Sequence, residues 1–163
     1  MSKIIVDIET IGVDFESFDE EHLASASIGQ TYTATLKGGQ KVVIKIQRPN
    51  IEEKIRLDLL LMDLLAKWMI KRYPELAVIN IVDVVKEFEE IIFQELNYLN
   101  EASNMMRFKD MFNGDDRVRI PEVYHSYTTK RLLVMEFLDG VPPDRIDLIK
   151  EMRVNTSIIA ENG

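Results

Sequence analysis

The clearest pattern near the start of the chain is an alternation of threonines with larger or apolar residues over residues 31–36. A period of two is typical of a strand with one buried face. Gly38-Gly39 then predicts a hairpin turn, and residues 41–47 form the returning strand. The two faces of that strand carry Val42, Ile44 and Ile46 on one side, and Val43, Lys45 and Gln47 on the other. The pattern therefore predicts a β-hairpin with one apolar face.

Two long helices are predicted next, because apolar residues recur every three to four positions. The first is expected to run from Asn50, a good N-cap residue, to Tyr73, where Pro74 stops it. Its apolar stripe consists of Ile51, Ile55, Leu59, Met62, Ala66 and Met69. The second is expected as one continuous helix over residues 81–112, which Asn113-Gly114 ends. Its predicted buried stripe consists of Val85, Phe88, Ile92, Leu96 and Leu99.

The remaining segments complete a small mixed fold. The acidic residues 14–21 predict a polar turn or a short helix. Two more strands are expected near residues 118–127 and 131–137, and a short terminal helix roughly over residues 144–160. We therefore expect an α+β fold in which helices cover one side of a small antiparallel sheet.

Composition narrows the possible functions. The chain has 163 residues, of which 46% are hydrophobic, and this suits one compact domain. Its net charge of -8 argues against binding to a phosphate backbone, so no nucleic-acid partner is expected. It contains no cysteine, which excludes disulfides and thiolate chemistry, and His22 and His125 lack the spacing of zinc ligands.

The sequence shows neither a secretory signal nor a membrane span. The apolar Ile4-Ile5-Val6 is followed at once by acidic residues, unlike a signal peptide. The most apolar helical stretch, residues 57–70, is interrupted by charges. We therefore expect a cytoplasmic location, with peripheral membrane association considered for a full-length parent.

Lys45 is unexpected, because it lies in the middle of an apolar strand. A buried ammonium needs a carboxylate or a phosphate as a partner. Protein kinases place such a lysine on their third strand, where it contacts nucleotide phosphates and pairs with a helical glutamate. The alternative is an edge-strand lysine whose stem reaches water.

The second helix contains the acidic candidates for that pairing. On one continuous helix Glu101 shares a face with Asn97, whereas Glu95 lies about 120° away from Glu101. One face could therefore meet Lys45 while Glu95 points elsewhere. The alternative is a solvated acidic face, which Glu89 and its neighbours clearly form nearby.

A third element is the small-residue segment that precedes the first strands, Ala24-Ser25-Ala26-Ser27. Kinases place a glycine-rich loop over the phosphates at this position, because small residues let the backbone approach closely. Only one glycine, Gly29, follows here. From composition alone, the segment would be an ordinary small-residue turn.

Taken together, the three elements resemble the AarF/UbiB family of atypical kinases. The segments that carry the resemblance are FDEEHLASASIGQTYTATLKGGQKVVIKIQRPNIEEKIRLDL, QELNYLNEASNMMRF and RVRIPEVYHSYTTKRLLVMEFLDG. They run collinearly from about Phe15 to the end of the chain. The resemblance implies a protein-kinase-like N-lobe over residues 1–138, with the hinge and the first part of a C-lobe over residues 139–163.

The resemblance also implies residue roles. Ala24, Ser25, Ala26 and Ser27 correspond to the family's alanine-rich loop, which lies over the nucleotide. Lys45 corresponds to the phosphate-contacting lysine and Glu101 to its ion-pair partner. Residues 135–138 match the hinge, where backbone groups of Glu136 and Leu138 would hold the adenine edge. Glu95 and Asn97 fall on the E-x-D motif, although Asn97 replaces its aspartate. Asn104 falls on a family pattern without an assigned role.

The family implies ATP or ADP with magnesium as cofactors, yet several of its motifs are missing here. The K-x-G-Q motif belongs upstream, and the H-x-D-P-H-P-G-N and D-F-G-like segments downstream, of this sequence. We therefore expect no magnesium ligands and no activity in this chain alone. The parent is expected to be a kinase or ATPase linked to isoprenoid-quinone metabolism. Its expected partners are nucleotide, the C-lobe, and quinone-lipid intermediates or a membrane surface.

Two alternatives remain from the sequence. The first is a catalytically dead pseudokinase fragment that binds a protein or lipid partner; Asn97 favours it. The second is an ordinary protein kinase lobe. The alanine-rich loop and the E-x-N stretch disfavour that second alternative.

Overall fold

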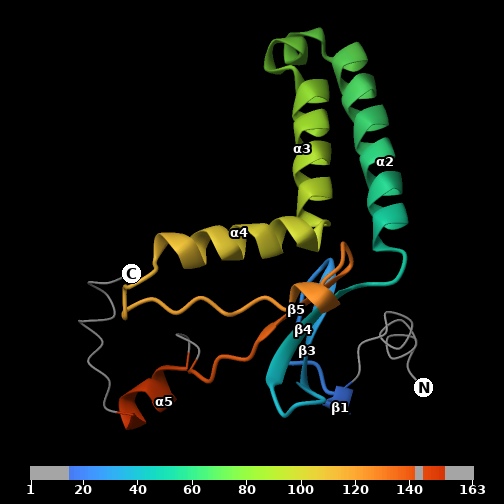
Figure 1. Ribbon diagram of the computed structural model, residues 1–163. Helices are drawn as coiled ribbons and strands as arrows, with labels where there is room; N and C mark the ends of the chain where they lie inside the picture. The colour runs from blue at the N-terminus through green and yellow to red at the C-terminus, as the bar shows by residue number, and fades with distance from the viewer. Residues whose placement is uncertain (1–14, 142–144, 153–163) are drawn as a thin grey trace.

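The computed structural model describes residues 15–141 and 145–152 (Figure 1). Four strands come first: β1 (Phe15–Phe18), β2 (Ala24–Ser25), β3 (Gly29–Leu36) and β4 (Lys41–Gln47). The helices that follow are α2 (Ile51–Arg72), the short 3-10 helix η1 (Pro74–Ile79), α3 (Ile81–Glu95) and α4 (Tyr98–Met111). The described chain ends with η2 (His125–Tyr127), β5 (Leu132–Glu136) and α5 (Ile146–Glu151). This content confirms the predicted α+β class.

The strands form one antiparallel sheet in the order β1-β3-β4-β5, with β2 paired to β3. The predicted hairpin of β3 and β4 is present, and Ala34 pairs with Val42 in its register. Its turn contains Gly39 in the left-handed region at φ 80°, which glycine adopts without steric cost. Because β4 lies between β3 and β5, the strand that carries Lys45 is central in the sheet.

One sheet face carries the main apolar core. Its buried residues are Tyr32, Ala34, Leu36, Val42, Ile44, Ile46, Leu132 and Val134. Phe15 and Phe18 of β1 pack against them, and the ring centroids of Phe18 and Tyr32 lie 5.2 Å apart. The prediction of a turn or helix over residues 14–21 was therefore wrong for residues 15–18. The two aromatic side chains favour a strand there because they pack, partly buried, against the sheet.

α2 and α3 form an antiparallel hairpin that projects away from the sheet (Figure 1). The bounds of α2 agree with the prediction and Asn50 is its N-cap residue, but the side chain of Asn50 does not cap the helix. Asn50 adopts a left-handed conformation at φ 57° and makes no side-chain cap hydrogen bond. Of the predicted stripe, Leu59 and Ala66 are buried, whereas Met62 is exposed.

The prediction of one continuous helix over residues 81–112 was wrong. α3 ends at Glu95, and α4 starts at Tyr98 in a sharply different direction (Figure 1). Asn97 interrupts the helix with an extended backbone, and its side chain accepts a hydrogen bond from the Leu99 N–H. The break also changes the predicted stripe, because Val85 and Leu96 are buried but Phe88 and Leu99 are exposed.

The strand expected over residues 118–127 was also wrong, apart from a single bridge between Val123 and Met135. The Thr128 hydroxyl donates to the Tyr124 carbonyl at 3.0 Å and accepts from the Val134 N–H at 3.2 Å. It therefore replaces the direct backbone bond that would extend a strand, and η2 follows. β5 lies within the predicted second strand, and α5 lies within the predicted residues 144–160, part of which is outside the described residues.

No helix in the described ranges combines the length and the apolar character needed to cross a bilayer.

Candidate functional site

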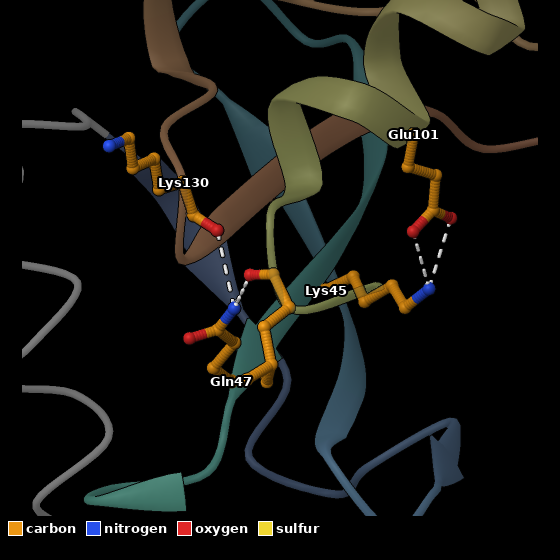
Figure 2. A network of polar contacts seen from close by, with 5 residues as sticks. Lys45, Gln47, Glu101 and Lys130 are labelled. Atoms are coloured by element: carbon orange, nitrogen blue, oxygen red, sulfur yellow. Dashed lines mark hydrogen bonds and ion pairs between the residues drawn. The ribbon is translucent and has the colours of Figure 1, made fainter. Parts of the chain in front are cut away.

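Lys45 projects from the face of β4 opposite the main core, toward α4 (Figure 2). Its Nζ donates to both carboxylate oxygens of Glu101, at 2.7 Å to Oε2 and 3.0 Å to Oε1. The two side chains are 28% and 38% exposed, so the pair is partly shielded from water while remaining accessible. The alternative of an edge-strand lysine was wrong, because β4 lies between β3 and β5.

The start of α4 places Glu101 at that position. The aromatic ring of Tyr98 and the methyl group of Ala102, on the same side of the helix, are buried against Leu133 of the sheet. Glu101 is three residues after Tyr98 and therefore faces the same sheet, where it meets Lys45 of β4. The predicted Lys45–Glu101 contact is thus present, although the angle assumed between Glu95 and Glu101 was wrong, because these residues belong to different helices.

Asn97 serves as the N-cap of α4. Its Oδ1 accepts the Leu99 N–H at 3.2 Å, and its amide contacts Asn100. Aspartate and asparagine are about equally good N-caps. An asparagine at this position therefore provides the cap without the negative charge that an aspartate would add.

The residues 96–98, which we call the α3–α4 elbow, are fixed to the sheet by a network that the sequence did not reveal (Figure 2). The buried Gln47 side-chain amide donates to the carbonyls of Leu96 and Lys130. The Lys130 carbonyl also accepts the Tyr98 N–H at 3.1 Å. Alternation along β4 places Gln47 on the face of Lys45, but its backbone partners could not be inferred from sequence.

Tyr98 lies beneath the start of β3. Its side chain is fully buried, and its hydroxyl has no hydrogen-bond partner. The Lys45 ammonium lies 5.0 Å from the ring centroid, within cation–π range. Burial, together with the nearby Glu101 carboxylate, raises the pKa of Tyr98 to about 12. Tyr98 is therefore neutral at ordinary pH and acts as an apolar support beneath the ion pair.

The small-residue segment lies in line with Lys45. Ala24 pairs with Thr31, and Thr31 in turn pairs with Lys45, so the three residues form one row across the sheet. Ala24, Ser25, Ala26 and Ser27 are all exposed. Arg48, which no sequence motif indicated as a site residue, donates to the Ala26 carbonyl at 3.1 Å and to the Ser25 hydroxyl at 2.8 Å. The Arg48 guanidinium therefore holds this segment through two hydrogen bonds.

The hinge candidates lie at the end of β5. The Glu136 N–H donates to the Glu122 carbonyl at 2.7 Å, so this donor is already used within the protein. The Glu136 carboxylate pairs with Arg119 and accepts the Glu122 N–H. Burial alone would raise the pKa of Glu136, but these donors together lower it below its ordinary value. The Glu136 side chain is thus structural, and only its carbonyl could face a ligand.

An open cleft of about 680 Å³ joins several predicted site residues. Its lining includes Lys45, Glu95, Asn97, Glu101, Asn104 and Arg107. Ala24, Ser25, Ala26, Ser27, Glu136 and Leu138 do not line it. Within the described residues, no group of three or more His, Cys, Asp or Glu side chains could hold a metal ion. The cleft therefore offers two cations and two carboxylates, but no metal cage formed by these residues alone.

Comparisons with known proteins agree with this geometry. Residues 8–163 match the family model of the ABC1 atypical kinase-like domain. The "Probable protein kinase UbiB" of Sodalis glossinidius (strain morsitans) is 41% identical over 149 residues, which cover 91% of this chain and 27% of that protein. The protein of the same name from Aeromonas salmonicida (strain A449) is 38% identical over 157 residues, which cover 96% of this chain and 28% of that protein.

A solved structure has a fold similar to that of this chain. The complex of Rv3197 with erythromycin from Mycobacterium tuberculosis has a TM-score of 0.66 and 32% sequence identity, over 81% of this chain and 32% of that chain. This similarity supports a kinase-like N-lobe for the sheet with α4. The chain spans only 27–28% of the curated relatives above. It belongs to the ABC1 atypical kinase-like family and corresponds to one part of the longer UbiB-type proteins.

Proposed function

We propose that this chain is the nucleotide-facing part of a UbiB-type atypical kinase or ATPase, and that it binds ATP or ADP through Lys45. The observation that supports the proposal most is the ion pair between Lys45, on a central strand, and Glu101 of α4. In protein kinases the corresponding lysine contacts the phosphates, and its glutamate partner must be in place for activity. Glu101 would hold the Lys45 ammonium in position for an incoming phosphate.

Two further contacts would complete the nucleotide site. The exposed Ala24–Ser27 loop shares a sheet row with Lys45, and its small side chains would let backbone groups approach the phosphates. On β4 the hinge residue Glu136 pairs with Val42, three residues from Lys45, which is about 10 Å along a strand. The Glu136 carbonyl and the Leu138 N–H would bind the adenine edge at that distance.

The whole protein would supply what this part lacks. We propose that its C-lobe provides the magnesium ligands and that the complete enzyme acts in isoprenoid-quinone lipid metabolism at a membrane surface. Bound magnesium would neutralise phosphate charge during transfer. The residues of this chain would bind and orient the nucleotide, and the chain alone would show no ATP turnover.

Thermal melts of the 163-residue chain test the proposal. A ligand that binds only the native state stabilises it by RT ln(1 + [L]/Kd), so 10 mM ADP or ATP with a Kd of about 1 mM should add about 1.4 kcal/mol. Lys45→Met should abolish the shift, and Glu101→Gln should reduce it. Lys54→Met, at an exposed position of α2, is the matched control and should keep the wild-type shift. Magnesium and ionic strength are held constant.

A second candidate is a catalytically dead pseudokinase fragment that acts as a protein or lipid interaction module. The exposed apolar side chains of α2, including Leu61 and Trp68, favour it. Equal nucleotide shifts in wild type and in Lys45→Met would remove Lys45 from the site. That result would make the interaction module the better hypothesis.

A further inference from the structure

Gln47 is buried even though its side-chain amide has two hydrogen-bond donors and two acceptor lone pairs. It is 6% exposed and lies two residues after Lys45, on the same face of β4. A primary amide nitrogen has two N–H donors, and two carbonyl oxygens, those of Leu96 and Lys130, lie in front of it. Donors and acceptors therefore match in number, and both acceptors belong to backbone rather than to a flexible side chain.

These hydrogen bonds hold the α3–α4 elbow, where the chain turns from α3 into α4. Leu96 is the C-cap of α3, Asn97 is extended, and Tyr98 is the first residue of α4, so the chain changes direction within the α3–α4 elbow. The Tyr98 N–H also donates to the Lys130 carbonyl. The elbow is thus held by Gln47 from β4 and by the Lys130 carbonyl from the segment before β5.

The elbow is close to the ion pair along the helix. Glu101 follows Tyr98 by three residues, or about 4.5 Å of helix rise. Over such a short, hydrogen-bonded distance the helix moves almost as a rigid body. A displacement of the elbow would therefore move the Glu101 carboxylate away from Lys45, which is fixed separately by the pairing of β4 with β3 and β5.

We infer that Gln47 is a positioning residue for the nucleotide site: it fixes the α3–α4 elbow so that Glu101 meets Lys45 before any nucleotide binds. One strand thereby carries both the phosphate-contacting lysine and the group that places its partner helix. The inference rests on the proposed function for the role of the ion pair, but not for the geometry itself.

Selective acylation of lysines in the 163-residue chain tests this inference without nucleotide. An amine held in an ion pair reacts slowly with acetyl N-hydroxysuccinimide, and peptide mass spectrometry measures the rate at each lysine. Gln47→Met keeps the length of the side chain but removes both donors. We expect the Lys45 rate to rise about two- to fivefold, as for loss of a partly exposed ion pair. Glu101→Gln should give a similar rise, and the double variant no further increase.

Two controls separate positioning from general loss of structure. Gln40→Met alters a glutamine in the exposed β3–β4 turn and should leave the Lys45 rate unchanged. Lys54, on the exposed side of α2, is the internal reference within every sample. If Gln47→Met does not fold, Gln47→Asn keeps the amide but shortens it, and the Lys45 rate should then lie between those of wild type and Glu101→Gln.

An unchanged Lys45 rate in a folded Gln47 variant would overturn the inference, as would additive effects in the double variant. That outcome would leave the proposed function standing, because wild-type nucleotide binding is measured separately. Conversely, a wild type without any nucleotide shift would remove the proposed function, while a faster Lys45 reaction in Gln47→Met would still establish the positioning. If the positioning inference and the proposed function are both correct, Gln47→Met should also reduce the thermal stabilisation by nucleotide.

Discussion

The sheet with α4 and the α2–α3 hairpin use their apolar residues differently. Val42, Ile44, Leu132, Leu133 and Val134 in the sheet, and Tyr98 in α4, are fully buried. The hairpin buries only Leu59, Ala66 and Val85, and exposes Leu57, Leu60, Leu61, Leu64, Leu65, Trp68, Val84, Phe88 and Ile91. Within the described structure, α2 and α3 are packed mainly against each other, so each buries one narrow stripe. Apolar periodicity therefore identified the helices, but only packing decides which apolar residues stabilise them.

The largest expected effect tests whether stability resides in the sheet. Ile44→Ala should lower the free energy of unfolding by roughly 2–5 kcal/mol, because it removes a fully buried side chain and leaves a cavity. Leu61→Ala, at a position that is 63% exposed, should change it by less than about 0.5 kcal/mol. Denaturation by urea measures both. Similar losses at the two positions would show that the hairpin surface is covered in solution.

A smaller effect is expected at the contact between α4 and β3. A Cβ atom at Gly29 would lie 2.4 Å from the Tyr98 hydroxyl oxygen and 2.8 Å from the Ile46 carbonyl oxygen. Gly29→Ala should therefore cost about 1–3 kcal/mol, as overpacking usually does. Tyr98→Phe alone should cost little, because the hydroxyl has no partner to lose.

The double variant Gly29→Ala/Tyr98→Phe sharpens this test. It should recover part of the loss, since removing the hydroxyl relieves the closer of the two contacts. Chemical denaturation of the four proteins gives the coupling between the two positions. Strictly additive effects would mean that Tyr98 does not press against the start of β3.

The smallest effect concerns the elbow that divides the two regions. Asn97→Ala removes the cap of α4 and should cost about 1 kcal/mol. Asn97→Asp introduces the aspartate that the E-x-D resemblance implies and keeps the cap, so stability should stay within about 0.5 kcal/mol of wild type. Thermal and urea unfolding compare the two variants. A loss in Asn97→Asp as large as in Asn97→Ala would show that a negative charge beside Glu95 and Glu101 is not tolerated.

The sequence predicted the β3–β4 hairpin, the bounds of α2 and the ion pair, but not the break between α3 and α4. The alternation of threonines and apolar residues specified the β3–β4 hairpin, because burial on one face leaves a period of two. The family resemblance predicted the contact of Lys45 with Glu101. The break at Asn97 was missed because apolar spacing continues through it, and capping competes locally with helix continuation.

Other misses have a different cause. Gln47 bonds to the backbone carbonyls of Leu96 and Lys130, and backbone groups leave no trace in residue identity. Arg48 reaches the small-residue segment only because it follows β4 next to the start of β3, the strand that pairs with both β2 and β4. Thr128 replaces a backbone bond of β5, which a strand pattern cannot reveal.

The placement of Lys45 and Gln47 on one face of β4 has a consequence for how the chain could change in length. Side chains on a strand point alternately to opposite faces, so a single inserted residue inside β4 reverses the side to which all later residues point. An insertion between Val42 and Lys45 would send the ammonium and the amide toward the buried core and bring Ile46 to the α4 face. Added residues at the exposed Gly38-Gly39 turn would leave both assignments intact. The segment from Val42 to Gln47 therefore cannot change in length without losing the site, whereas the turn before it can accommodate added residues.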